Sequence, residues 1–134
     1  MSTKVIRPTV YVASKTYYAR LWRNYRELGW NIISTWIDEA EVGQTKDFTD
    51  LWSRCVSEAS RADILILYHT EGDVLKGALV EVGAALASGK EVWKVGNWAG
   101  DSFKHHPKVR SFNNLSDVDS ELFSLEIKST KSPA

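Results

Sequence analysis

Short apolar runs alternate along the chain with stretches whose apolar residues recur at helical spacing. The clearest run, DILILYH at 63–69, is nearly unbroken, which is typical of a strand buried on both faces. The stretch 16–28 instead repeats its apolar residues every three or four positions and predicts a helix that ends near Gly29. By these criteria the pattern predicts strands at 9–14, 30–36, 63–69 and 91–97, a possible edge strand at 110–114, and helices at 16–28, 46–60, 75–90 and 115–127, the last with Ser116 or Asp117 as N-cap.

The alternation of strand and helix predicts an α/β fold. We expect a three-layer, doubly wound (flavodoxin-like) parallel sheet of about five strands with helices on both faces. Such sheets bind ligands at the carboxyl ends of their strands, near the point where strand order reverses. The helix at 46–60 is expected to face the core with Phe48, Leu51, Trp52, Cys55, Val56 and Ala59.

Composition restricts the possible partners. The chain has 134 residues, 43% hydrophobic and 25% charged, which suits one domain over 1–134 with a disordered tail at 127–134. Basic and acidic residues number 17 each, so no net field attracts a nucleic acid polymer or a membrane surface. No signal peptide or membrane-spanning run is visible, and the single cysteine, Cys55, fits a cytoplasmic location.

One acidic residue, Glu81, interrupts the most apolar stretch of the chain, LKGALVEVGAALASGK at 75–90. Because apolar residues lie nearly all round this predicted helix, we expect it to be enclosed by protein. An ionised carboxylate there costs several kcal/mol unless it is compensated, and the helix dipole is expected to help keep it ionised. Glu81 is therefore the best candidate for chemistry, against a structural ion pair with Lys76 or an arginine. The core-facing stripe is expected to hold Leu75, Leu79, Val82 and Leu86.

Three segments resemble the superfamily of nucleoside 2-deoxyribosyltransferases and 2′-deoxynucleoside 5′-phosphate N-hydrolases. They are VYVASK after the first strand, RADILIL at the third, and ALVEVGAALASGKEV, in which the family's E-x-G-x-A string begins at Glu81. The resemblance spans about residues 9–96. It implies a five-stranded parallel sheet, a homodimer, no metal or organic cofactor, and cleavage of an N-glycosidic bond. It gives Glu81 the role of the nucleophile that forms a covalent glycosyl-enzyme, which water or a second base resolves.

Two positions depart from that family pattern. Cys55 stands where the family usually has an aspartate used near the base, and Leu75 where transferases tend to have an aspartate and nucleotide hydrolases a serine. Asp38, at the carboxyl tip of the predicted second strand, either replaces the missing aspartate as general acid or caps a turn. Trp36 beside it either stacks on the base or packs in the core.

Other binding residues are expected at strand ends and at a helix start. Ser14 and Lys15 match the family's ligand-contacting loop and either favour an anionic group such as a 5′-phosphate or form an ordinary turn. Lys76 and Gly77 open the predicted helix of Glu81, where Lys76 holds a phosphate, pairs with Glu81 or is solvated. Asn97 follows the fourth strand and completes the set.

The remaining candidates favour structural interpretations. His69 is a lone histidine, and His105 and His106 have no carboxylate or cysteine at ligand spacing, so no metal site is expected. We predict cleavage of the N-glycosidic bond of a 2′-deoxynucleoside or its 5′-monophosphate, by hydrolysis or base exchange. The alternatives are an NAD-type glycohydrolase and a non-catalytic nucleotide-binding module.

Overall fold

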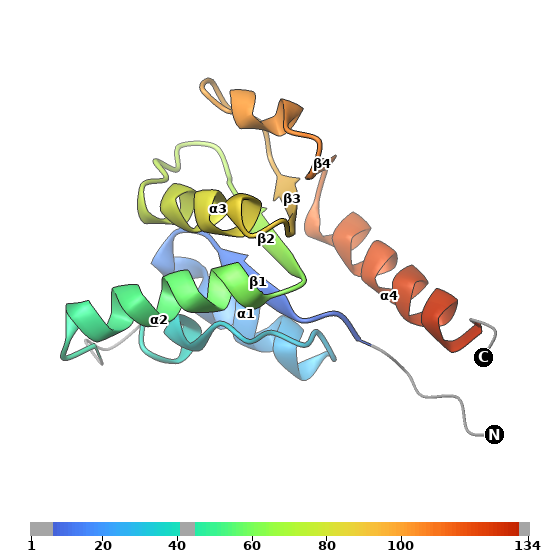
Figure 1. Ribbon diagram of the computed structural model, residues 1–134, viewed down its shortest axis with the longest axis horizontal. Helices are drawn as coiled ribbons and strands as arrows, with labels where there is room; N and C mark the ends of the chain where they lie inside the picture. Colours follow the sequence, from blue (N-terminus) through green and yellow to red (C-terminus); the bar gives the residue numbers. More distant parts are fainter. Residues whose placement is uncertain (1–6, 41–44, 132–134) are drawn as a thin grey trace.

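The computed structural model describes residues 7–40 and 45–131, with side chains as far as residue 125. Its centre is a parallel sheet of four strands in the order β1-β2-β3-β4 (Figure 1). In its register, Tyr11 lies beside Leu65, and Leu65 lies beside Val92. The strands are β1 Val10–Ala13, β2 Ile64–Tyr68, β3 Glu91–Val95 and β4 Val109–Phe112.

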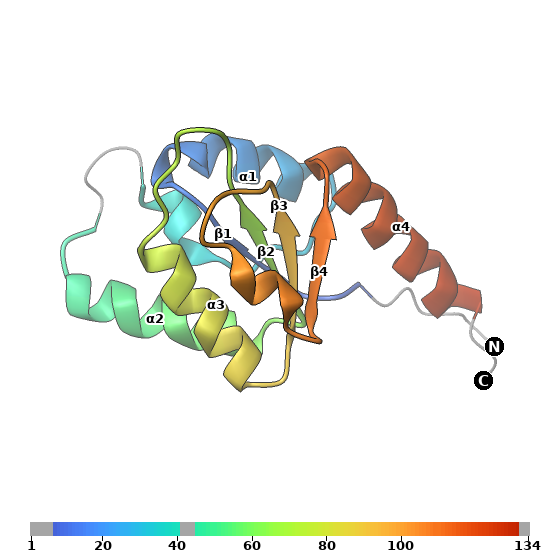
Figure 2. The same cartoon turned by 90° about the horizontal axis from the view of Figure 1, so that it is seen from above.

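Helices cover both faces of this sheet. Figure 2 shows α1 and α4 on one face and α2 and α3 on the other. The predicted three-layer, doubly wound α/β fold is therefore confirmed. The α-helices are α1 Ala19–Glu27, α2 Phe48–Arg61, α3 Gly77–Ala87 and α4 Leu115–Lys131, and the 3₁₀ helices are η1 Thr16–Tyr18, η2 Thr35–Asp38 and η3 Ser102–His105.

The predicted strand at 30–36 is reduced to a single bridge between Ile32 and β1. Beyond this bridge, side chains satisfy the outer edge of β1. Ser34 Oγ accepts the Val12 N–H at 2.7 Å, and the Trp36 indole N–H donates to the Val12 carbonyl at 2.8 Å. A full second strand is therefore not needed to pair these groups, and the chain turns into η2. With Ile32 as the remnant of an edge strand, strand order reverses at β1, as in flavodoxin-like sheets.

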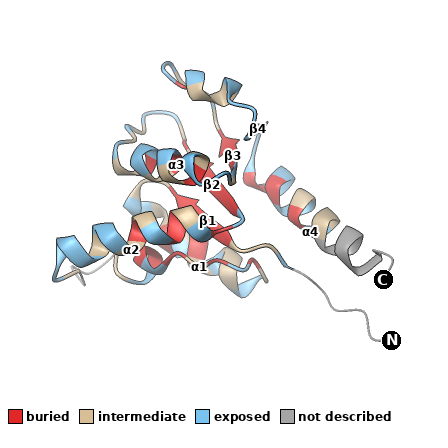
Figure 3. Ribbon diagram, viewed as in Figure 1, coloured by how far each residue is buried: buried red, intermediate tan, exposed pale blue. Residues whose placement is uncertain are grey.

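The inner face of α2 is shorter than its sequence predicts. Asp47 caps the helix with its side chain, and Cys55 and Ala59 are buried in the core. Phe48 and Trp52, predicted to lie in the core, are instead 67% and 45% exposed. Figure 3 shows α2 changing from exposed at its N-terminal end to buried farther along. In Figure 1 the exposed end extends past the sheet, so no strand covers it.

Helix α3 is not enclosed by protein, contrary to the prediction. Its buried residues are Ala78, Val82 and Ala85, while Leu79 and Val80 are exposed. The alanines bring α3 close to its neighbours because they carry little side-chain volume. The predicted core stripe is therefore wrong at Leu79, and an apolar face of α3 lies open to solvent.

Helix α4 begins after Asn114, whose side-chain oxygen accepts the Asp117 N–H at 2.8 Å. Asn114, and not Ser116 or Asp117, thus caps the helix. The helix continues to Lys131, so the expected disordered tail at 127–134 is helical as far as that residue, and residues 132–134 lie outside the described part. Across the described ranges, no helix combines the length and apolar character needed to cross a bilayer.

Candidate active site

A cavity of about 320 Å³ opens at the carboxyl ends of β1 and β2, where strand order reverses. Its wall is formed by the chain after β1, the chain after β2, helix α2, the start of α3 and Trp36 of η2. A volume of this size is typical of a small-molecule site. The lining consists of residues 14–16, residues 74–78, Trp36, Glu81, and Phe48, Leu51, Trp52 and Cys55 of α2.

Glu81 reaches this cavity from the second turn of α3. Its Oε1 accepts a hydrogen bond of 2.8 Å from the hydroxyl of Tyr11, which is wholly buried in β1. No cation pairs with Glu81 anywhere in the part of the chain that the structure describes, so the alternative of an ion pair with Lys76 does not hold there. The sequence reasoning missed Tyr11. The available signal was a tyrosine in a buried aliphatic strand, since a buried phenol normally needs a hydrogen-bond partner.

The surroundings of Glu81 favour its protonated form. Burial raises the pKa of its carboxyl group to about 7, the Tyr11 hydrogen bond partly opposes that rise, and the nearby charge of Glu58 adds to it. Burial, and then the charge of Glu81, also raises the pKa of Tyr11, which stays protonated as the donor. The expectation that the helix dipole keeps Glu81 ionised is therefore not met. Glu81 is the fifth residue of α3, and the dipole acts mainly within the first turn. Near neutral pH the group populates both protonation states.

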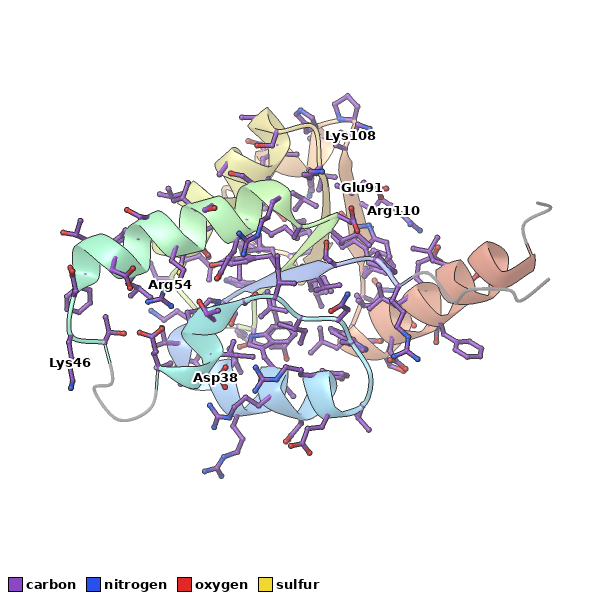
Figure 4. All side chains as sticks on the ribbon, turned by 60° about the horizontal axis from the view of Figure 1, so that its bottom comes forward. Asp38, Lys46, Arg54, Glu91, Lys108 and Arg110 are labelled. Atoms are coloured by element: carbon purple, nitrogen blue, oxygen red, sulfur yellow. The ribbon has the colours of Figure 1, made fainter. Side chains whose placement is uncertain are left out.

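Asp38 lies outside the cavity lining. Both of its oxygens accept hydrogen bonds of 2.9 Å from Arg26, and Figure 4 shows Asp38 on η2 beside α1. The Arg26 hydrogen bonds keep the pKa of Asp38 below its ordinary value, against a smaller opposing effect of burial. The structure thus places the expected general acid in a partly exposed ion pair.

The loops after β1 and β2 are joined across the cavity. Ser14 accepts the Trp22 indole N–H at 2.8 Å and donates to the Lys15 carbonyl at 2.9 Å. Lys15 Nζ donates to the carbonyl of Val74 at 3.4 Å, and the Tyr17 hydroxyl donates to Asp73. These contacts hold Ser14 and Lys15 where the sequence predicts ligand-binding residues.

Four further predicted binding residues divide into three that line the cavity and one that does not. Trp36 lines it but is largely buried, and its indole N–H is already bonded to the backbone. Lys76 and Gly77 line it at the start of α3. Asn97 does not; its side-chain oxygen accepts from Lys94 at 3.1 Å. Lys15 and Lys76 therefore bring positive charge to the cavity that holds Glu81.

The two positions that depart from the family pattern both line the cavity. Cys55 and Leu75 line the same cavity as Glu81. Burial raises the pKa of the Cys55 thiol to about 11, so it is protonated at neutral pH and unsuited to act as a nucleophile. The departures are thus located at the site itself.

A buried ion pair lies at the carboxyl end of β3. Lys94 is fully buried, and its Nζ contacts Asp101 Oδ2 at 3.1 Å and lies 5.0 Å from the centre of the Trp98 ring. The Gly96 carbonyl accepts another hydrogen bond from the same ammonium group. Gly96 has φ of +97°, and a Cβ there would lie 2.2 Å from the His69 carbonyl oxygen, so only glycine fits. His69 stacks on Trp98 at 4.3 Å, which matches its predicted structural role. In the described ranges, no three histidine, cysteine or acidic side chains gather in a group able to hold a metal ion.

The chain was compared with known proteins. No protein-family model matches it, and no curated protein does. Among solved structures, the CMP N-glycosidase BcmB of Clostridium botulinum is similar, with a TM-score of 0.55 and 15% identity, over 89% of this chain and 98% of that chain. At this identity the likeness shows a shared fold. It agrees with the parallel α/β sheet that the sequence resemblance implied.

Proposed function

We propose that the protein cleaves the N-glycosidic bond of a 2′-deoxynucleoside or its 5′-monophosphate, with Glu81 as nucleophile. The observation that carries this proposal is the Glu81 carboxyl group itself. It lines a cavity of about 320 Å³, and the buried Tyr11 hydroxyl holds one of its oxygens at 2.8 Å. A partly buried acid whose pKa is raised, which lines a cavity and has no cation paired with it in the described ranges, is typical of a catalytic group.

The proposed reaction has two steps. In the first, Oε2 of ionised Glu81 forms a bond to the anomeric carbon while the bond from that carbon to the base nitrogen breaks. Tyr11 donates its hydrogen bond to Oε1, so Oε2 is the oxygen left free to attack. The departing base takes a proton from solvent, since Asp38 lies outside the cavity and has no role in this scheme. In the second step, water or another base forms a bond to the same carbon while the bond from that carbon to Glu81 Oε2 breaks; the attacking group loses its proton to solvent, and Glu81 is released as a carboxylate.

The cavity also offers positive charge for the rest of a nucleotide. Lys15 and Lys76 both line it, so a 5′-phosphate there would meet two ammonium groups. BcmB, named as a glycosidase of the nucleotide CMP, has the same fold, which supports a nucleotide substrate. The free thiol of Cys55 suits the cytoplasmic location that we propose.

The direct test is to trap the intermediate. Incubation with 2′-deoxynucleosides, their 5′-monophosphates and NAD, followed by chromatography of free bases, identifies the substrate and separates the NAD-type alternative. A 2′-fluoro analogue of that substrate should then leave a glycosyl group on Glu81, because fluorine slows the second step. Mass spectrometry of peptides would detect the added mass of the glycosyl group on the peptide that contains Glu81. Base release without any adduct on Glu81, together with full activity of Glu81→Gln, would rule the proposal out.

The second candidate function is a nucleotide-binding module without chemistry. The position of Asp38 favours it, because the expected general acid is held by Arg26 outside the cavity. Such a module would be stabilised against heat by nucleotides, with no base released from any of them. A glycosyl-Glu81 adduct would exclude it.

We also propose that the chain forms a homodimer through the outer face of α3. Val80 is 53% exposed and Leu79 38% exposed, and small residues around them allow close approach of a second copy. Val80→Glu should convert a dimer into a monomer in sedimentation analysis, while Glu71→Lys, on an exposed loop residue, should not. A monomeric unmodified protein would contradict this assembly.

A further inference from the structure

One apolar stripe of α2 continues from the core into the cavity. Its members Phe48, Leu51, Trp52 and Cys55 follow the pattern i, i+3, i+4 and i+7, so they share one face of the helix, and all four line the cavity. Cys55 is buried, whereas Phe48 and Trp52 are 67% and 45% exposed. A stripe of core character is therefore left uncovered where it borders Glu81.

Trp52 also differs from the other tryptophans of the chain. Among the described residues, its indole N–H has no hydrogen-bond partner and its ring has no aromatic neighbour. The other five rings are each held by such a contact: Trp22 with Ser14, Trp30 with Asp119, Trp36 with the Val12 carbonyl, Trp93 with Glu91, and Trp98 with His69. Hydrogen bonds and aromatic contacts within the described chain therefore do not explain why a tryptophan stands at position 52.

The ring of Trp52 nevertheless packs against a neighbouring helix. A Cβ added to Gly77 would lie 3.2 Å from Trp52 Cη2, so the ring packs over the first residue of α3. The absence of a side chain at Gly77 lets the ring approach α3 this closely. The ring therefore lies between α2 and α3 at the edge of the cavity.

We propose that Trp52, with Phe48 one turn earlier, forms the wall on which the aromatic base of the substrate stacks. This inference rests on the proposed function and assigns the two parts of the ligand to different sets of lining residues. The α2 wall is apolar and aromatic, while Lys15 and Lys76 on the loop side suit the sugar phosphate. Stacking requires the flat face of an aromatic ring and does not require a carboxylate that hydrogen-bonds the base. The presence of Cys55 in place of the family's aspartate agrees with this mode of binding.

The test separates the base from the sugar phosphate. Calorimetry would measure binding of the four 2′-deoxynucleoside 5′-monophosphates and of 2-deoxyribose 5-phosphate to Glu81→Gln protein, which binds without turnover. Adding Trp52→Leu should weaken nucleotide binding on the order of 10-fold, the size of one base–aromatic stack, and leave the sugar phosphate unaffected. Phe48→Leu should weaken nucleotide binding by a smaller factor. Phe123→Leu, an equally exposed ring on α4, is the matched control and should change neither ligand.

The outcomes distinguish this inference from the proposed function. Equal weakening of nucleotide and sugar phosphate by Trp52→Leu, unchanged binding of both, or no binding of any of the four nucleotides would each overturn the stacking wall. Base release by the unmodified enzyme that Trp52→Leu leaves intact would overturn the wall alone. Selective loss of nucleotide binding in Trp52→Leu, with no base release by the unmodified enzyme, would support the wall and overturn the glycosidase.

Discussion

Two carboxyl groups, Glu81 and Asp101, lie after neighbouring strands, and their surroundings shift their pKa values in opposite directions. Asp101 accepts from Lys94 at 3.1 Å and from the Trp98 backbone N–H at 3.3 Å. Burial opposes ionisation of Asp101, yet these hydrogen bonds and the charge of Lys94 bring its pKa below the ordinary value. Glu81 has only a neutral tyrosine as donor, and burial raises its pKa to about 7.

On this difference rests our proposal that Asp101 is a structural acid and Glu81 a functional one. The Lys94–Asp101 pair is complete without a ligand, because each group has a counter-charge and hydrogen bonds within the fold. Glu81 has no counter-charge within the described part of the chain, so its carboxylate opposes folding whenever it is ionised. Such a group is retained where chemistry requires it. The predictions below test this assignment of the two acids.

The largest expected effect is on turnover. Glu81→Gln keeps the shape of the side chain but removes the charged oxygen that attacks the sugar, so base release should fall on the order of 10⁴-fold. Rates of base release under substrate saturation would measure it, with circular dichroism to show that the fold persists. Glu71→Gln, on an exposed residue outside the cavity lining, is the matched control and should keep full activity. Similar rates for both variants would remove the functional assignment of Glu81.

The opposite outcome is expected when the structural pair is broken. Lys94→Met leaves Asp101 without its main counter-charge, so Tm should fall on the order of 10 °C. Base release well below that Tm should be retained, because Lys94 does not line the cavity. The double variant Lys94→Met with Asp101→Leu should recover part of the loss, since it leaves no buried charge unpaired; Lys104, which also contacts Asp101, is 37% exposed and stays solvated. An unchanged Tm in Lys94→Met would show that the pair does not support the fold.

The order of strands and helices could be predicted from the sequence because the hydrophobic period of each element is a local property. The predicted strand at 30–36 failed for a reason that is not local. Ser34 and Trp36 satisfy the edge of β1 with side-chain atoms, and only the folded chain shows which backbone groups they reach. The prediction that Phe48 and Trp52 lie in the core was wrong for another reason. Apolar residues at helical spacing give the same pattern whether they contact a core or line a cavity.

Part of the candidate site could also be predicted. Glu81 stood out because a carboxylate in an apolar stretch needs an explanation wherever it lies. Its partner Tyr11 is 70 residues away, and sequence spacing does not indicate such a contact. Asp38 was expected at the cavity from its place at a predicted strand end, yet Arg26, only 12 residues before it, holds it elsewhere.

A smaller effect concerns stability and its dependence on pH. Burial raises the pKa of Glu81 from 4.5 to about 7, which corresponds to about 3 kcal/mol of destabilisation when the group is ionised in the folded state. Below pH 4.5 the carboxyl is protonated in both states, so the penalty is absent. It grows as pH rises from 4.5 to 7 and is constant above. Glu81→Gln should therefore be about 3 kcal/mol more stable than the unmodified protein at pH 8.5 and equally stable near pH 4.

Urea unfolding at several pH values would measure that difference. The matched comparison is Glu71→Gln, whose exposed carboxyl should give no pH-dependent gain. A stability difference between Glu81→Gln and the unmodified protein that is the same at pH 4 and pH 8.5 would show that burial does not oppose the charge. The contrast between Glu81 and Asp101 would then lose its physical basis.

The smallest expected effect isolates the hydrogen bond from Tyr11. This bond lowers the pKa of Glu81 against the effect of burial, so Tyr11→Phe should raise that pKa above about 7. Because the ionised form attacks the sugar, kcat/KM rises with pH through this pKa. The midpoint should therefore move up by about one pH unit in Tyr11→Phe, with activity at pH 7 reduced about 5-fold and largely recovered above pH 9. Tyr25→Phe, a tyrosine outside the cavity lining, should leave the midpoint unchanged. Since phenylalanine keeps the buried ring, a uniform loss of activity at every pH would mean that Tyr11 fixes the position of Glu81 and does not set its ionisation.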